Sequence, residues 1–240
     1  MTSQDRSYLA LDTSGNSFRV CALHGSETFV RHSMDGSERA SLPELVSGAL
    51  EDANLDFSAL AGIAVSSGPG SFTGLRVGLS FAKAIALSRN IPLLGISSFE
   101  QALDSEIVKR CGNIELMLIH MKAESYYVYA PGGPFDPEGI RVAGIAEISR
   151  ESAIRGGQDR PAGQYCFIDS PAPEAFLTDC GNADRTVMVP LEITDLARLA
   201  GQRFDRNEVV DWRRIEPLYV QRSNAEINFD ARQGKQTDAG

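Results

Sequence analysis

The apolar positions near the start of the chain follow the patterns of β-strands. Tyr8–Leu11 is a continuous apolar run, and Phe18, Val20 and Ala22 then alternate with their neighbours over the length of a second strand. A third strand is expected at 27–32. Turn residues separate the three segments, so the pattern predicts a β-meander.

Helical periodicity begins after the meander. Apolar residues recur at i, i+3, i+4 and i+7 from Leu42 to Ala53, and Ser41 with Glu44 three residues later is the pattern of a capping box. The elements predicted next are a strand at 63–65, a helix at 73–87, a strand at 92–96 and an amphipathic helix at 99–110. The first 110 residues therefore predict the order βββαβαβα.

The stretch 63–87 joins a buried strand to a helix through a glycine-rich turn. Gly68 and Gly70 can take positive φ there, and Ser71 or Thr73 can cap the helix. One face of this helix carries almost no side chain, because its residues at i+4 spacing are Gly74, Gly78, Ala82 and Ala86. Such a face packs either on the chain's own sheet or on a partner helix, and the pattern leaves both alternatives open.

The pattern restarts in the second half of the chain. A strand at 115–119, a turn at 120–125 and a strand at 126–130 repeat the opening pattern, a further buried strand is expected at 164–168, and a helix at 194–204. We therefore predict a duplicated α/β fold with a first lobe at 1–110, a second lobe at 111–222 and a flexible polar tail at 223–240.

Composition narrows the classes of function. With 240 residues, 42% of them hydrophobic, the chain can bury a full core. Its formal net charge of −9 disfavours unaided binding of nucleic acid, because concentrated Lys and Arg hold phosphate backbones. A polar start and the lack of an apolar run near the ~20 residues that cross a bilayer predict a cytoplasmic protein without membrane contact. The scattered cysteines favour reduced thiols.

Candidate chemistry gathers at the turn that follows the first strand. Its backbone N–H groups and hydroxyls can hold phosphate oxygens while the Asp12 carboxylate holds a metal-bound water, or the turn is an Asx turn that closes a hairpin. With the glycine-rich loop, the candidate nucleotide- or phosphate-binding residues are Asp12, Thr13, Ser14, Gly68, Gly70, Ser71, Thr73 and Gly74.

The glycine-rich loop matches none of the common phosphate or nucleophile motifs. A Walker loop needs Lys after Gly74, a dinucleotide fingerprint needs Gly at Thr73, and a nucleophile elbow needs Gly at Pro69. None of the three histidines has a second histidine at i+3 or i+4, so the sequence predicts no metal-ligand pair on a helix.

Two segments resemble the TsaB (YeaZ) family, the small non-catalytic paralogue of TsaD. They are Leu9–Ser14 (LALDTS) and the long motif Ser67–Gly78 (SGPGSFTGLRVG), and Glu216–Tyr219 is similar to the family's C-terminal segment. The resemblance implies an actin-like ASKHA (ribonuclease H-like) fold of two lobes, each with a mixed β-sheet flanked by helices. It further implies a scaffold or activating subunit, without catalytic residues or a metal of its own. Such a subunit dimerises with a TsaD-like protein for N6-threonylcarbamoyladenosine formation at position 37 of ANN-decoding tRNAs.

The resemblance also implies the partners and the interface. In that family TsaD carries the metal and the transfer site, TsaE supplies ATPase activity, and TsaB assembles through helices that match 42–54 and 73–87 here. The residues expected at the partner interface are Leu45, Ala49, Gly74, Gly78, Ala82 and Ala86. The small-residue face also predicts a homodimer when the partner is absent. The resemblance implies no intrinsic cofactor and only indirect contact with tRNA, and it allows ATP or ADP with Mg²⁺ at the partner interface.

The second lobe departs from the family pattern in two places, and other functions stay open. His120–Ser125 replaces an expected Asp-Ala-Arg-x-Gly-Glu segment, and Asp169–Pro171 replaces a Gly-x-Gly turn. One alternative is a stand-alone ASKHA-type ATPase or kinase that uses Asp12, Thr13 and the loop 68–74, although it needs a second phosphate loop that the sequence lacks. A metallopeptidase is the third hypothesis, and it needs metal ligands that the sequence lacks.

Overall fold

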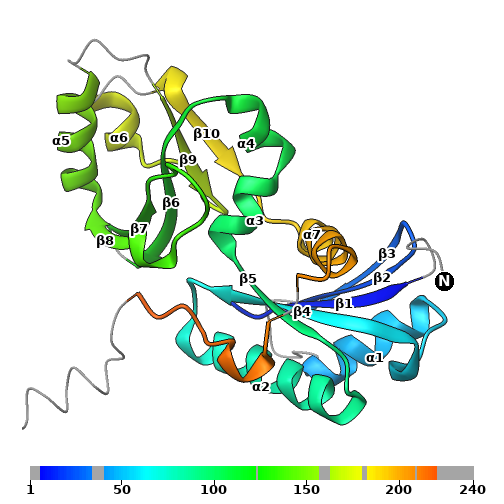
Figure 1. Cartoon of the computed structure of the whole chain (residues 1–240). Coiled ribbons are helices and arrows are strands. Elements are labelled where there is room, and N and C mark those ends of the chain that lie inside the picture. The colour runs from blue at the N-terminus through cyan, green and yellow to red at the C-terminus, as the bar shows by residue number, and fades with distance from the viewer. Residues whose placement is uncertain are drawn as a thin grey trace, which may run out of the picture.

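The chain forms two lobes, each built on one five-stranded mixed sheet (Figure 1). The computed structural model describes residues 6–33, 41–122, 124–156, 163–179, 183–208 and 210–220, so the predicted tail at 223–240 lies outside the described residues. No helix among these residues has the length and apolar character that a membrane crossing requires. The predicted α/β fold of two mixed sheets flanked by helices is confirmed.

Sheet A forms the first lobe and contains the predicted meander. Its strands are β1 (Ser7–Asp12), β2 (Arg19–His24), β3 (Glu27–His32), β4 (Leu60–Gly68) and β5 (Leu93–Ser97), in the order β3-β2-β1-β4-β5. β1, β2 and β3 pair antiparallel, whereas β1, β4 and β5 pair parallel. Strand β1 is central and is buried along its whole length, which explains its continuous apolar run.

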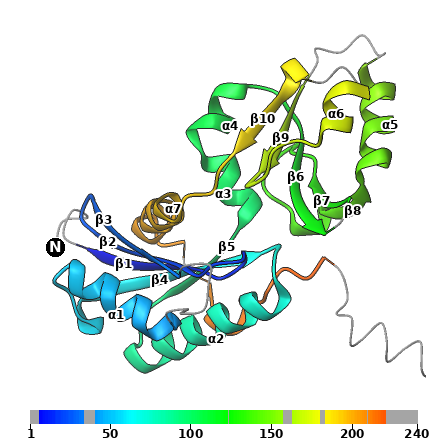
Figure 2. The ribbon, with the colours of Figure 1, turned by 180° about the vertical axis from the view of Figure 1, so that it is seen from behind.

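Helices cover both faces of sheet A (Figure 2). α1 (Leu42–Asp52) and α2 (Phe72–Arg89) lie on one face, and α7 (Ile193–Asp205) lies on the other. Alternate residues of β1 face opposite sides of sheet A. Leu9 packs in the cluster with α1 and α2, and Tyr8 packs in the cluster with α7. The helix predicted at 42–53 has the expected start, because the Glu44 carboxylate accepts a 2.6 Å hydrogen bond from the backbone N–H of Ser41.

Sheet B repeats this topology in the second lobe. Its strands are β6 (Ile114–Lys122), β7 (Ser125–Tyr129), β8 (Arg141–Gly144), β9 (Gln164–Ile168) and β10 (Thr186–Val189), in the order β10-β9-β6-β7-β8. As in sheet A, a three-stranded antiparallel meander is followed by two parallel strands. α5 (Ile145–Gly156) and α6 (Glu174–Asp179) pack on one face, and α3 (Ser98–Asp104) and α4 (Glu106–Cys111) pack on the other. The predicted duplication is thus present in the strand order.

The lobes do not divide the chain at residue 110 as predicted. Phe99 of α3 and Val108 of α4 pack with sheet B, while Leu196 of α7 packs with sheet A. The chain therefore crosses between the lobes after β5 and again after β10. The helix predicted at 99–110 is also interrupted, because Ser105 is extended (ψ 145°) and caps α4 through Val108. The turn predicted at 120–125 is shorter, since β6 continues to Lys122.

The segment after α7 returns to sheet A near the start of α2. The backbone N–H of Leu218 donates a 2.8 Å hydrogen bond to the carbonyl oxygen of Ser67. The ring of Tyr219 lies 4.8 Å from that of Phe72, measured between centroids. The Nε of Arg76 on α2 also donates a 2.9 Å hydrogen bond to the Tyr219 hydroxyl, so this segment, which is not a strand, holds the end of the described residues against α2.

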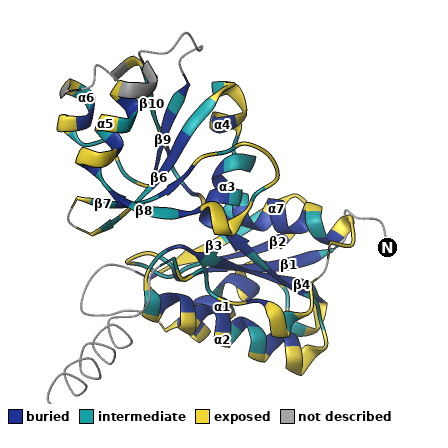
Figure 3. Cartoon of the chain, turned by 60° about the vertical axis from the view of Figure 1, so that its left-hand side comes forward, coloured by how far each residue is buried: buried dark blue, intermediate teal, exposed yellow. Residues whose placement is uncertain are grey.

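The residues predicted for a partner interface are buried inside the first lobe. Leu45, Ala49, Ala82 and Ala86 belong to the core between sheet A and its helices. A Cβ at Gly74 would overlap the carbonyl oxygen of Thr13, and one at Gly78 would overlap the Thr13 side chain. Figure 3 shows the inner sides of α1 and α2 as buried and their outer sides as exposed. The small-residue face therefore packs on the chain's own sheet, and the prediction that it receives a partner helix is wrong.

Replacing Gly78 by Ala should lower the free energy of unfolding by about 1–3 kcal/mol, because the added methyl overfills the contact with Thr13. Alanine is the better helix former by about 1 kcal/mol, so a loss measured by chemical denaturation would come from this contact. Gly48→Ala on α1 is the matched control, since its methyl would meet only the Arg31 side chain at 3.5 Å. Equal stabilisation of both variants would contradict the packing of α2 on Thr13.

Two thiols should be inert in the folded protein at pH 8. Burial raises the pKa of Cys21 to about 11, and burial together with the neighbouring Cys111 thiol raises the pKa of Cys166 to about 12. Both groups therefore stay protonated, and only the thiolate reacts with disulfide reagents. Peptide mass spectrometry after native and denaturing labelling should find Cys111 modified before Cys21 and Cys166, the other two cysteines among the described residues. Native labelling of Cys166 as fast as that of Cys111 would refute the assignment.

Candidate functional site

A cavity of about 540 Å³ lies between the two lobes and is the candidate site. We call it the interlobe cleft and define it by Ser14, Arg19, Gly70, His120 and Asp169, which are among its lining residues. In each lobe the parallel strands point their carboxyl ends toward it. Ligands of open α/β sheets bind at such strand ends, which makes the cleft the natural place for a bound molecule.

The two segments predicted to bind phosphate meet at the sheet A side of the cleft. The backbone N–H of Ser71 donates to the carbonyl oxygen of Ser14 at 2.7 Å, and the Thr13 hydroxyl donates to the carbonyl oxygen of Gly74 at 2.6 Å. A Cβ at Gly70 would lie 2.5 Å from the carbonyl oxygen of Ser14. Glycine is thus required at Gly70 and Gly74 so that the two backbones can approach each other.

The Asp12 carboxylate has both oxygens engaged within the chain. Oδ1 accepts from the backbone N–H of Ser14 at 2.9 Å and from its hydroxyl at 2.6 Å, which is the Asx turn foreseen as the simpler alternative. Oδ2 accepts from Nη2 of Arg19 at 2.5 Å and from its Nε at 3.2 Å. Only 5% of the Asp12 side chain is exposed. The predicted contact of Asp12 with a metal-bound water would require these bonds to be replaced.

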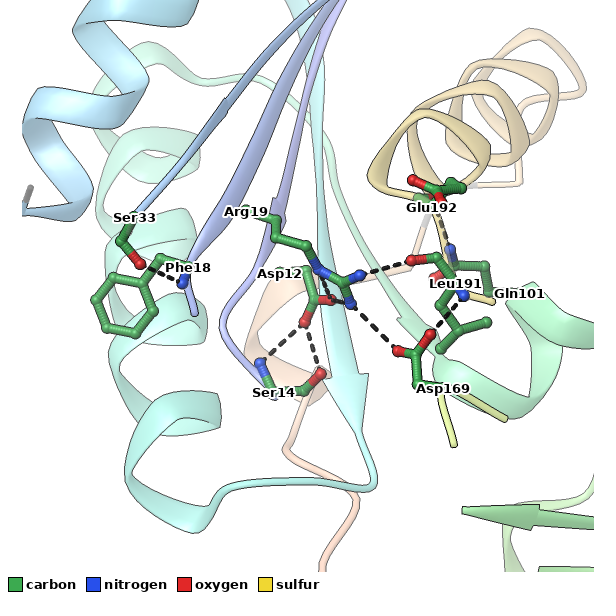
Figure 4. Close-up of polar contacts among 9 residues, drawn as sticks. All are labelled: Asp12, Ser14, Phe18, Arg19, Ser33, Gln101, Asp169, Leu191 and Glu192. Atoms are coloured by element: carbon green, nitrogen blue, oxygen red, sulfur yellow. Dashed lines mark hydrogen bonds and ion pairs between the residues drawn. The ribbon is translucent and has the colours of Figure 1, made fainter. Parts of the chain in front are cut away.

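Arg19 extends from β2 across the cleft to the second lobe (Figure 4). Its Nη1 donates to the carbonyl oxygen of Leu191 at 2.6 Å, and its Nη2 lies 3.6 Å from Oδ2 of Asp169. Oδ1 of Asp169 accepts from the backbone N–H of Leu191 at 2.7 Å, and the Gln101 amide donates to the carbonyl oxygen of Glu192 at 2.8 Å. The crossing after β10 is therefore tied to both lobes.

The charges of this cluster shift the pKa values of its members. Burial raises the pKa of Asp169 and the negative charge of Asp12 adds to the rise, while the Leu191 N–H and Arg19 act in the opposite direction. Burial by itself would lower the pKa of Arg19, but the nearby carboxylates of Asp12, Asp169 and Glu192 raise it overall. Arg19 therefore remains a fixed cation at the centre of an acidic group.

The remaining predicted phosphate-binding residues lie at the start of α2 or just before it. Ser71 caps the helix by accepting from the N–H of Gly74 at 3.2 Å. Thr73, the alternative cap, is exposed on the helix instead. Gly68 adopts a φ of 97°, the left-handed conformation that the turn requires. The structure thus brings the predicted residues together, although Thr73 points away from the contact, and their role toward phosphate stays a prediction.

Arg19 and Asp169 were missed as site residues from the sequence. Asp12 and Arg19 are opposite each other in the register of β1 and β2, and a hairpin centred on Gly15 and Asn16 would have predicted this pair. Asp169 directly follows β9, the strand of sheet B that takes the place of β4 in sheet A. Among the described residues, no group of three His, Cys, Asp or Glu side chains is arranged to hold a metal ion.

Comparison with known proteins relates parts of the chain to enzymes and subunits of tRNA modification. The family model described as TsaD, tRNA N6-adenosine threonylcarbamoyltransferase, matches residues 37–115. The protein of that name from Pelobacter propionicus is 42% identical over 46% of this chain and 41% of its own. The tRNA threonylcarbamoyladenosine biosynthesis protein TsaB of Haemophilus influenzae is 30% identical over 40% of this chain and 41% of its own. The curated matches span from 15% to 41% of the relatives' lengths.

A solved structure shares the fold over nearly the whole chain. It is a Pseudomonas aeruginosa protein described as similar to peptidase YEAZ, with a TM-score of 0.61 and 21% identity over 90% of this chain and all of the other. At this identity the likeness establishes the fold. With the Haemophilus match, it agrees with the resemblance of this chain to the TsaB (YeaZ) family and shows the predicted fold of two lobes.

Replacing Asp12 by Asn should lower the free energy of unfolding by about 2–3 kcal/mol, because it leaves the partly buried Arg19 without its nearest counter-charge. Thermal and urea unfolding measure the change. Asp52→Asn is the matched control: Asp52 also pairs with an arginine, Arg31, but both side chains are more than a third exposed, so stability should hardly change. Similar losses in the two variants would argue against Asp12 as a structural anchor.

Proposed function

We propose that this chain is a TsaB-like, non-catalytic subunit in tRNA threonylcarbamoyladenosine biosynthesis, which acts by pairing with a TsaD-like transferase. In this proposal the partner supplies the metal and the transfer chemistry for ANN-decoding tRNAs, and a TsaE-like protein supplies ATPase activity. The chain contacts tRNA only indirectly, in keeping with its formal net charge of −9.

The proposed non-catalytic role is supported by the Asp12 carboxylate, because both of its oxygens are already hydrogen-bonded within the chain. Its oxygens accept hydrogen bonds from Ser14 and Arg19. A stand-alone ATPase or kinase would need this carboxylate for a metal-bound water and a second loop for phosphate. In the second lobe, the carboxylate of Asp169 faces the same Arg19, and no glycine-rich loop stands in the sequence beside it.

The partner surface that we propose is the outer side of α2, in place of its buried small-residue face. Val77 is 41% exposed and Leu87 is 62% exposed, and the exposed Ala84 lies between them on the same side of the helix. Exposed apolar side chains at i, i+7 and i+10 suit a helix-to-helix contact. The same surface is the one through which we propose that the chain self-associates when the partner is absent. ATP or ADP with Mg²⁺ at this heterodimer interface is part of the proposal.

Calorimetric titration with the TsaD-like protein of the same organism tests this proposal. The wild-type chain should bind, and Val77→Asp and Leu87→Asp should each weaken binding by about tenfold or more, because a buried carboxylate would replace an apolar contact. Both positions are exposed in the isolated chain, so circular dichroism should find both variants folded.

Met188→Asp is the matched control for this titration. Met188 is an equally exposed apolar residue (51%), but it lies on β10 in the other lobe, so its replacement should leave the affinity unchanged. A wild-type chain that does not bind the TsaD-like protein would refute the proposed pairing. Binding that only Met188→Asp weakens would place the interface on sheet B.

A further inference from the structure

The Arg19 side chain reaches from the first lobe to the second lobe across the interlobe cleft. Arg19 sits on β2 of sheet A, Asp12 ends β1 of the same sheet, and Asp169 follows β9 of sheet B. One nitrogen, Nη2 of Arg19, lies within 3.6 Å of a carboxylate oxygen from each lobe. Two carboxylates that share one cation at strand ends, beside a cleft, resemble an arrangement in which proteins hold a divalent cation.

We infer that Arg19 takes the place of a divalent cation in the interlobe cleft: it joins the two lobes itself and excludes metal-bound nucleotide from this site. Arg19 is thereby a specificity-determining residue of the cleft. The inference concerns the cleft of the single chain, so it holds whether or not the partner proposed above binds.

The donor geometry of the Arg19 guanidinium fits the acceptors around it. The planar guanidinium uses Nε and Nη2 toward Asp12, Nη2 toward Asp169 and Nη1 toward the carbonyl oxygen of Leu191. Three acceptors on three separate segments fit the fork of an arginine, whereas a lysine ammonium could not span them in this way. The positive charge of Arg19 therefore lies beside a carboxylate of each lobe, where a bound cation would lie.

Each of the two carboxylates has one oxygen hydrogen-bonded within the chain and one oxygen that faces Arg19. The Oδ1 of Asp12 is taken by Ser14, and the Oδ1 of Asp169 is taken by the Leu191 N–H. Both Oδ2 atoms face Arg19. A hard cation at 2.0–2.6 Å from these oxygens would have to displace the guanidinium, because the two positive charges cannot share the position.

Arg19 balances the negative charges of the acidic side chains around it. The acidic side chains of Asp12, Asp169 and Glu192 all act on it and together raise its pKa, so it stays charged at every pH at which the protein is folded. Without Arg19 the cleft would carry uncompensated carboxylates. Removal of this one side chain should therefore create affinity for a divalent cation where the wild-type chain has none.

Mn²⁺ titration followed by electron paramagnetic resonance tests the inference on the full chain. Wild type should leave the free Mn²⁺ signal unchanged. Arg19→Met should bind one Mn²⁺ at least about tenfold more tightly than wild type, and the added change Asp169→Asn should remove that gain. Arg31→Met is the matched control, since it frees the exposed Asp52 from its arginine partner away from the interlobe cleft.

Three outcomes would overturn the inference. They are Mn²⁺ binding by wild type that Asp12→Asn abolishes, a folded Arg19→Met variant that gains no affinity, and an equal gain in Arg31→Met. Should Arg19→Met fail to fold, titration of wild type with ADP decides the question. Heats that are the same with Mg²⁺ and with a chelator support the inference, and Mg²⁺-dependent binding by the single chain overturns it.

Discussion

The close contact between Thr13 and the first two turns of α2 is the constraint on which the first lobe depends. Gly74 and Gly78 leave room for the backbone and side chain of Thr13, whose hydroxyl donates to the Gly74 carbonyl oxygen. This contact fixes where α2 starts relative to the end of β1, and hence where the turn at Asp12 lies. The segments 12–14 and 70–74 thus satisfy each other's polar groups, while Ser14, Gly70 and Ser71 line the interlobe cleft.

Arg19 has a comparable effect between the lobes. Folds of two similar lobes change the angle between them at the crossings of the chain, and here one crossing is held by Arg19 through Leu191 and, beside it, by Gln101 through Glu192. These bonds lie beside the cavity of about 540 Å³ between the lobes. The outer side of α2, with Val77 and Leu87 exposed, is the surface that we propose for association with another protein.

Much of this fold could be predicted from the sequence, because apolar periodicity reports burial. The continuous run in β1, the i+4 glycines of α2 and the restart at Ile114 gave the sheets, the helix and the duplication. Periodicity could not reveal which lobe a helix joins, so the sequence did not show that side chains of α3 pack on sheet B or that α7 packs on sheet A. Small residues predict a close contact without naming what makes it. The pairing of Arg19 with Asp169 joins positions 150 residues apart, which no local pattern encodes.

We propose that the turn at Asp12 stabilises the fold and does not support nucleotide turnover. Phosphate release by the purified single chain with ATP and Mg²⁺ is the decisive measurement, because turnover at this turn would need the Asp12 carboxylate free for a metal-bound water. The wild-type chain, folded and at high concentration, should release no phosphate above the level in buffer. Multiple turnovers that disappear in a folded Asp12→Ala variant would rule out this structural role and establish the chain as an enzyme in its own right.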